Sequence, residues 1–231
     1  MSIHKLAVIS LLLSALCTGC ATSPRSRVTI QRVATYISPA MAENAPGRIV
    51  VVPFAAPACA PEAGHMATAS LAMAIQGTLC CDTVLPAEGD ERLAAESALW
   101  QSGRVDVESL IVAQKAYLAD AFLFGTVTQY KPYDPPALGL KLRLLSARTG
   151  DVIWAADALF NAHESDVRAL AECYFRNSGL KDRLYGPELQ LMSPKLFADF
   201  VAAQVVRPLG EQLKRKRDVA SADPAHSHME R

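Results

Sequence analysis

The sequence predicts an α/β (α+β) domain with a mixed sheet of about five strands, a βαβααβββ order, helices packed on the sheet and a C-terminal helix. Three observations support this class. The β-branched run at 48–54, RIVVVPF, is typical of a strand buried on both faces. Residues 63–79 and 107–118 have apolar side chains at helical spacing, and residues 87–100 have a composition typical of a helix. Alternating segments between 122 and 160 predict a three-strand antiparallel meander.

The first half of the domain alternates strands with helices. Residues 63–79 repeat apolar side chains at helical spacing, and 83–85 predict a short second strand. Acidic residues in the first turn favour a helix over 87–100 because they complement the positive end of the helix dipole. Asp106 is a suitable N-cap for the next helix, at 107–118.

The meander follows directly. Residues 122–130 alternate between two faces, and in 138–147 leucines at every second position share one face. The sequence RTGD at 148–151 predicts a tight turn into a third strand at 152–160. Trp154, on a strand that faces helices, is expected to lie in the core.

The remainder is predicted to be helical and then disordered. Residues 164–177 form one helix, and Ser193 is the N-cap of a longer one that ends at about residue 213. Pro208 removes a backbone hydrogen bond, so a kink or an early end is expected just before it. Residues 214–231 lack apolar periodicity, which predicts a disordered polar tail.

The start of the chain predicts a signal peptide over residues 1–19. A weakly basic start precedes an apolar run that is shorter than the roughly 20 residues needed to span a bilayer, and a small pair then precedes Cys20. This pattern resembles bacterial lipoprotein signals. The resemblance implies that Cys20 carries a diacylglycerol thioether and an acylated amino terminus, so that labelled palmitate should enter the protein. Ala21 implies sorting to the periplasmic face of the outer membrane. The alternative is an ordinary cleaved signal with an incidental cysteine.

Residues 20–47 are expected to form a lipidated tether ahead of a domain that spans 48–213. Ser, Pro, Arg and Ala dominate this stretch, and a flexible chain of that length has a root-mean-square reach of about 30 Å. An alternating patch at 28–30 leaves open an added edge strand, as do Tyr36 and Ile37.

Charge argues against a nucleic-acid partner. The chain holds 23 basic and 23 acidic residues, and loss of Lys5 with the signal leaves 22 against 23, one unit negative. Apolar residues make up 51% of the chain and charged residues 20%, which suits a globular domain with a substantial core.

Cysteine pairing is left open. Cys17 is removed with the signal and Cys20 is lipidated. The cysteines that remain are Cys59, Cys80, Cys81 and Cys173. In the periplasm they allow two disulfides in three connectivities, while free and mostly buried thiols are the favoured alternative. No CxxC or Cys/His pattern supports a metal site.

Four segments carry a resemblance to known families: RIVVVPF, SLAMAIQGTL, AYLADAFLFGTVTQY and LRLLSARTGDVIW. Together they resemble the α/β domain of the curli secretion channel subunit, the amino-terminal domain of TolB, penicillin-binding-protein activator lipoproteins and the Pel polysaccharide export lipoprotein. The match covers about residues 48–160. Its most specific parts are the signal ADAFLFGTV at 119–127 and the signal ARTGDVIW at 147–154.

No catalytic motif is present, so neither an enzyme nor a cofactor is expected. The loop after the first meander strand is the main candidate for partner binding, because its prolines lower the entropy lost on docking and its tyrosines offer amphipathic contact area. The residues expected to contact a partner are Tyr130, Tyr133, Asp134 and Pro135, with Arg215 in the basic run near the C-terminus. The alternatives are a turn whose tyrosines cover the domain's own edge and a solvated helix end.

These observations predict a non-enzymatic, outer-membrane-anchored lipoprotein. We expect it to dock onto, or self-assemble within, a periplasmic envelope complex for export, surface appendages or cell-wall synthesis. One alternative is a ligand-binding or enzymatic periplasmic lipoprotein, which needs polar groups that converge on a cleft beside the sheet. The other is a ring-forming oligomer.

Overall fold

The computed structural model describes one compact unit, which falls within Gln31–Arg231. The described residues are 33–43, 45–79, 81–86, 106–133, 135–177 and 191–222. Several predicted features lie outside them: the signal peptide at 1–19, Cys20, the patch at 28–30, Cys80, the helix at 87–100, Asp134 and the chain beyond 222.

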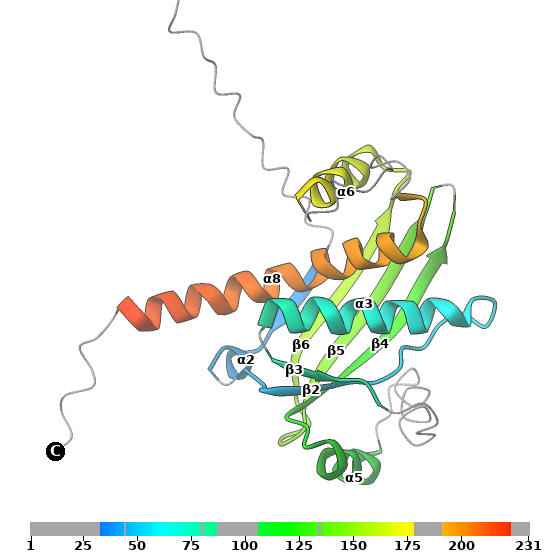
Figure 1. Ribbon diagram of the computed structural model, residues 1–231. Coiled ribbons are helices and arrows are strands. Elements are labelled where there is room, and N and C mark those ends of the chain that lie inside the picture. The colour runs from blue at the N-terminus through cyan, green and yellow to red at the C-terminus, as the bar shows by residue number, and fades with distance from the viewer. Residues whose placement is uncertain are drawn as a thin grey trace, which may run out of the picture. The chain divides into compact units, whose positions relative to one another are not determined.

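A six-stranded mixed sheet forms the centre of this unit, in the strand order β1-β6-β5-β4-β2-β3 (Figure 1). The strands are β1 (Val33–Ile37), β2 (Arg48–Val51), β3 (Asp82–Val84), β4 (Ala121–Lys131), β5 (Ala137–Ser146) and β6 (Val152–Asn161). The helices are α2 (Pro39–Glu43), α3 (Pro61–Leu79), α5 (Val107–Tyr117), α6 (Ser165–Asn177) and α8 (Pro194–Ala222). β2 pairs in parallel with β3 and β4, and the other pairs are antiparallel. The predicted α/β (α+β) class and the meander are confirmed, with six strands rather than about five.

The additional strand comes from the segment that the sequence assigns to the tether. β1 pairs with β6 along its whole length. The indole N–H of Trp154 donates to the Thr35 hydroxyl oxygen over 3.2 Å, and Met41 of α2 is fully buried. The folded domain therefore includes residues from Val33 onward and does not begin at Arg48, because this segment covers part of the core.

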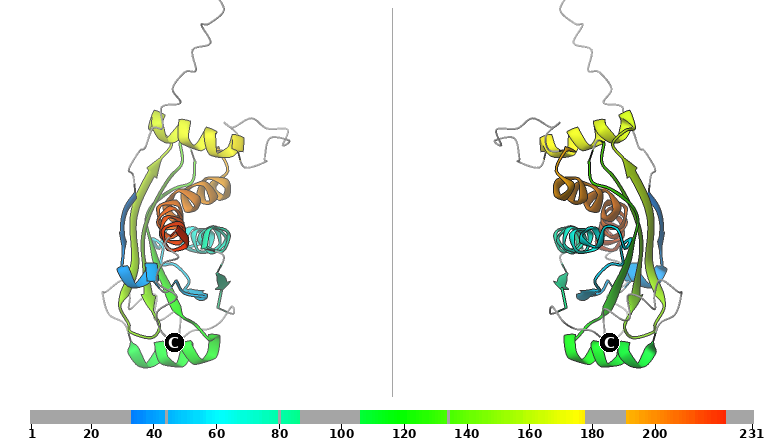
Figure 2. Two further views of the ribbon diagram at one scale, coloured as in Figure 1. Left: turned by 90° about the vertical axis from the view of Figure 1, so that its left-hand side faces the viewer. Right: turned by 90° about the vertical axis from the view of Figure 1, so that its right-hand side faces the viewer.

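β2 is buried on both faces, as its β-branched sequence predicts. Ile49 and Val51 belong to the main core between the sheet and the helices α3 and α8. Val50 and Val52 belong to a smaller core on the opposite face, to which α5 contributes Ala113. Figure 2 shows α3 and α8 together on one side of the sheet.

The meander follows the alternation read from the sequence. Leu138, Leu140, Leu142 and Leu144 of β5 all face the main core. Trp154 of β6 is fully buried in the same core, so its predicted position is confirmed.

The predicted cap of α5 is also confirmed. Asp106 has an extended backbone, and its carboxylate accepts the backbone N–H of Glu108 over 3.3 Å and the Ser109 hydroxyl over 2.6 Å. The bond from Ser109 is the main reason that the pKa of Asp106 lies below its usual value, since it stabilises the ionised form.

α8 is longer than the sequence suggests. It continues through Pro208 to Ala222, so the early end expected at the proline does not occur. Val206 and Leu209, on either side of this proline, are fully buried in the main core. Their burial offsets the roughly 3 kcal/mol that a proline inside a helix costs. Residues 214–222 of the predicted disordered tail are helical as well.

Candidate functional site

The β4–β5 hairpin carries the loop that the sequence favours for partner binding, and the structure separates its two tyrosines. Tyr130 is partly buried against the main core, whereas the Tyr133 side chain is 64% exposed. Pro135 is partly buried, and Asp134 lies outside the described residues. Each interpretation of the loop therefore fits one tyrosine: Tyr130 covers the domain's own edge, and Tyr133 faces solvent.

Tyr130 lies beside the start of α3. Burial raises the pKa of Tyr130 above its usual value of 10.0, and the charges of Glu62 and Tyr133 raise it further. A phenol at its usual pKa is already neutral near pH 7, and the upward shift extends this neutral range to higher pH. Tyr130 therefore anchors the hairpin on the body of the domain as an uncharged, half-buried group.

Arg215 lies elsewhere in the unit. Its side chain is exposed on α8, one residue after the exposed Lys214. The C-terminal half of α8 and the β4–β5 hairpin lie on opposite sides of the unit (Figure 1). The structure therefore does not bring Arg215 together with Tyr133, and the two predicted contacts belong to separate surfaces.

Asp120, the acidic residue of the first sequence signal, holds the chain at the start of β2 through hydrogen bonds to the backbone. Its Oδ2 accepts the backbone N–H groups of Gly47 at 3.0 Å and Arg48 at 2.9 Å. The Nε and Nη2 atoms of Arg48 each lie 2.9 Å from Oδ2 of Asp82. These contacts join the starts of β2, β3 and β4.

Gly125, from the same signal, leaves room for an aromatic ring. A Cβ atom at this position would lie 2.6 Å from the ring of Phe54, which is buried. Gly125→Ala should therefore lower the free energy of unfolding by about 1–3 kcal/mol, because the ring or the strand must move. Urea denaturation measures this change.

Gly77→Ala is the matched control for this prediction. A Cβ atom at Gly77 would meet nothing within 4 Å, and a helical glycine gains about 0.5–1 kcal/mol when it becomes alanine. If both variants had the same unfolding midpoint, the assigned role of Gly125 would be wrong.

The second sequence signal is structural too. Gly150 has a φ of +75°, which a side chain would strain, and it shapes the β5–β6 turn. The Thr149 backbone N–H donates to Ser146 Oγ over 3.3 Å within this turn. Asp120, Gly125 and Gly150 of the two signals therefore have structural roles in the fold.

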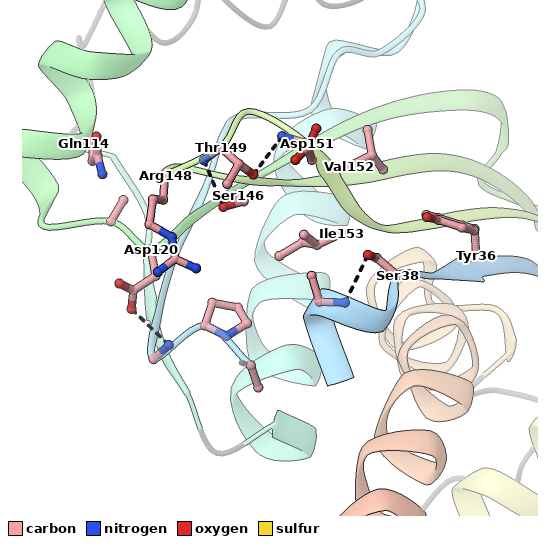
Figure 3. Close-up of a pocket in the computed structure, with 15 residues that line it drawn as sticks. Tyr36, Ser38, Gln114, Asp120, Ser146, Arg148, Thr149, Asp151, Val152 and Ile153 are labelled. Carbon is pink, nitrogen blue, oxygen red and sulfur yellow. Dashed lines mark hydrogen bonds between the residues drawn. The ribbon is translucent and has the colours of Figure 1, made fainter. Parts of the chain in front are cut away.

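A pocket of about 650 Å³ lies at the end of the sheet where β2 and β4 begin (Figure 3). Its polar and aromatic side chains come from Tyr36, Ser38, Gln114, Asp120, Ser146, Arg148, Thr149 and Asp151. In Figure 3 the Arg148 and Asp120 side chains point toward one another. Ligands of doubly wound folds bind at the carboxyl ends of the strands, so this pocket lies at the opposite end of β2 and β4.

The sequence did not reveal this pocket, because its lining joins segments that are far apart along the chain. It combines the end of β1, the approach to β2, the end of α5 and the β5–β6 turn. The polar turn at 148–151 and the acid Asp120 are the two local signals that could have indicated it.

The described cysteines differ in their exposure. Cys59 and Cys173 are exposed thiols, whereas Cys81 is buried, so the expected burial holds for one of these three. Over the described ranges, no group of three or more His, Cys, Asp or Glu residues is placed to hold a metal ion. None of the helices in those ranges is both long and apolar enough to cross a membrane.

No protein-family model and no curated protein sequence matches the chain. Among solved structures, it is similar to the PelC dodecamer from Paraburkholderia phytofirmans, with 16% identity, a TM-score of 0.49, and coverage of 77% of this chain and 96% of that chain. It is also similar to lipoprotein GNA1162 from Neisseria meningitidis, with 20% identity, a TM-score of 0.38, and coverage of 61% and 100%. The LpoB C-terminal domain from Escherichia coli matches with 18% identity, a TM-score of 0.31, and coverage of 49% and 82%.

All three structures are less than 25% identical to this chain and have TM-scores under 0.5. Identities this low concern the fold and assign no partner, ligand or oligomeric state to this chain. Its function therefore has to come from its own residues.

Proposed function

We propose that this protein is a non-enzymatic lipoprotein of the outer membrane that docks onto a periplasmic envelope complex. Cys20 holds the lipid anchor, and the β4–β5 hairpin presents Tyr133 to the partner. The observation that carries the proposal is the contrast within this hairpin, where Tyr130 is packed on the core and Tyr133 is 64% exposed.

The hairpin is a stiff base for such a contact. β4 and β5 stay paired up to Lys131 and Ala137, close to the tip of the loop. Pro132 and Pro135 restrict the backbone on either side of Tyr133. A tyrosine on a restricted loop offers a large amphipathic surface and loses little conformational entropy when it is buried.

The proposed tether is shorter than the sequence suggests. Because β1 begins at Val33, only residues 21–32 separate the lipidated Cys20 from the folded unit. A lipid anchor this near the folded unit would keep the hairpin in the neighbourhood of the membrane, which raises its effective concentration toward a membrane-bound partner.

Tyr133→Ala tests this function. A hot-spot tyrosine contributes about 2 kcal/mol or more to an interface, so co-purification of the partner from crosslinked envelopes should fall by roughly thirtyfold. Val107→Ala is the matched control, because Val107 is 66% exposed on α5 and lies away from the hairpin. Equal recovery of the partner with the Tyr133 variant and the wild type would contradict the proposal.

The pocket at the end of the sheet favours a second candidate function, the binding of a small polar ligand. Its volume of about 650 Å³ is typical of ligand sites, and polar groups from separate elements converge on it. Arg148→Ala with Asp151→Ala separates the two functions. Docking through Tyr133 predicts unchanged recovery of the partner, whereas a ligand-dependent function predicts its loss.

A further inference from the structure

The outer edge of β1 presents backbone groups that none of the described strands uses. The Ser38 N–H donates to the Ile153 carbonyl over 2.9 Å, so the even-numbered residues of β1 are those that bond to β6. The N–H and C=O groups of Val33, Thr35 and Ile37 therefore point away from the sheet. In the described part of the chain these outward groups have no hydrogen-bond partner.

This edge lacks the features that usually block strand addition. The sequence of β1, VATYI, has no charge and no proline, and its pairing with β6 has no bulge. Proteins normally protect an open edge with charges, prolines, bulges or very short strands. The opposite edge follows that rule, because β3 has three residues and its Asp82 binds Arg48.

We propose that β1 is a docking edge for an extended segment of a partner protein, which extends the sheet by one strand. The main-chain groups of Val33, Thr35 and Ile37 would supply the hydrogen bonds. Thr35 and Tyr36 are exposed and suit β-branched or aromatic side chains in the added strand. This surface is separate from the β4–β5 hairpin, so the inference does not depend on the role of Tyr133.

The pocket described above adds a means of selecting the segment. Tyr36 and Ser38 both line it, so it opens at the end of β1. When a strand adds to a sheet edge, main-chain bonds provide affinity, and pockets for alternate side chains provide specificity. The pocket fits a polar side chain, because Asp151, Arg148 and hydroxyl groups lie around it.

A separate partner fits this edge better than a second copy of the chain. Figures 1 and 2 show α8 crossing β1 and continuing past this edge of the sheet. Two copies paired through β1 about a two-fold axis would bring both α8 helices into the same space. A single extended segment meets only one such helix, which then covers one face of the added strand.

Photo-crosslinking in cells that produce the full-length chain tests this proposal. A photoreactive phenylalanine derivative replaces Ala34, Thr35 or Tyr36 in turn, and mass spectrometry locates the partner residue captured from each position. We expect the captured residues to advance one at a time along a single contiguous segment of another protein. Capture of the β1 strand of a second copy, scattered captured residues or no capture would overturn the proposal.

A pair of variants isolates the backbone contribution. With the probe at Tyr36, Thr35→Pro removes one outward N–H and should lower capture by about five- to tenfold, as the loss of one hydrogen bond implies. Thr35→Val keeps this N–H. Like the proline variant, it loses the Thr35 hydroxyl that accepts the indole N–H of Trp154, so capture should stay within about twofold of the wild type. Equal capture with both variants would show that the edge is not used for strand pairing.

Discussion

Cys20→Ala should release the protein from the membrane. The lipoprotein signal implies several acyl chains on Cys20, and each buried methylene contributes about 0.8 kcal/mol, so two or three chains hold a protein far more firmly than one. Without the thiol no thioether forms. Labelled palmitate should enter the wild type and not the variant, and the variant should leave the outer-membrane fraction.

Cys17→Ala is the control for the anchor, because Cys17 lies on the removed side of the proposed cleavage point. This variant should keep both the label and the membrane location. Palmitate incorporation into Cys20→Ala at the level of the wild type would show that the anchor is assigned to the wrong residue.

Phe200→Ala should greatly lower the stability of the folded unit. Phe200 of α8 is fully buried, and its ring centroid lies 5.6 Å from Phe160, 5.7 Å from Tyr174 and 5.8 Å from Phe197. Removal of a buried phenylalanine ring costs about 3–5 kcal/mol, a large part of the roughly 5–15 kcal/mol that stabilises a typical domain. Chemical denaturation of a form that lacks the first 20 residues measures the loss.

Leu159→Ala is the control for the cluster. Leu159 is on β6 beside Phe160 in sequence, but its side chain is 45% exposed on the other face of the sheet. We expect this variant to change the free energy of unfolding by about 0.5 kcal/mol or less. If the two variants lost equal stability, the aromatic cluster around Phe200 would not stabilise the fold in the way proposed.

Local sequence patterns predicted the parts of the fold that depend on local chemistry. The run at β2, the alternating leucines of β5 and the Asp106 cap each follow from neighbouring side chains, and each is confirmed. The edge strand that Tyr36 and Ile37 left open is also present as β1. The sequence could not decide between a strand and a loop there, because the segment has only five residues. Its pairing with β6, which the local pattern does not show, makes it a strand.

Features that depend on distant residues could not be predicted in this way. α8 continues through Pro208 because buried neighbours from β6 and α3 support it, and periodicity within the helix does not show them. The split between Tyr130 and Tyr133 depends on the position of α3, since Glu62 at its start lies near Tyr130. The pocket needs the ends of several elements to meet, which a linear motif cannot encode.

Photo-crosslinking from position 133 in the lipid-anchored chain tests the proposed docking function most directly. A photoreactive phenylalanine derivative at Tyr133 should capture one envelope protein at a level about tenfold or more above the same probe at Val107, as expected for a hot spot compared with an unrelated exposed site. The same capture should be lost when Cys20 is replaced by alanine. Equal capture from positions 133 and 107, or capture that is unchanged in Cys20→Ala, would contradict docking through the hairpin of an anchored lipoprotein.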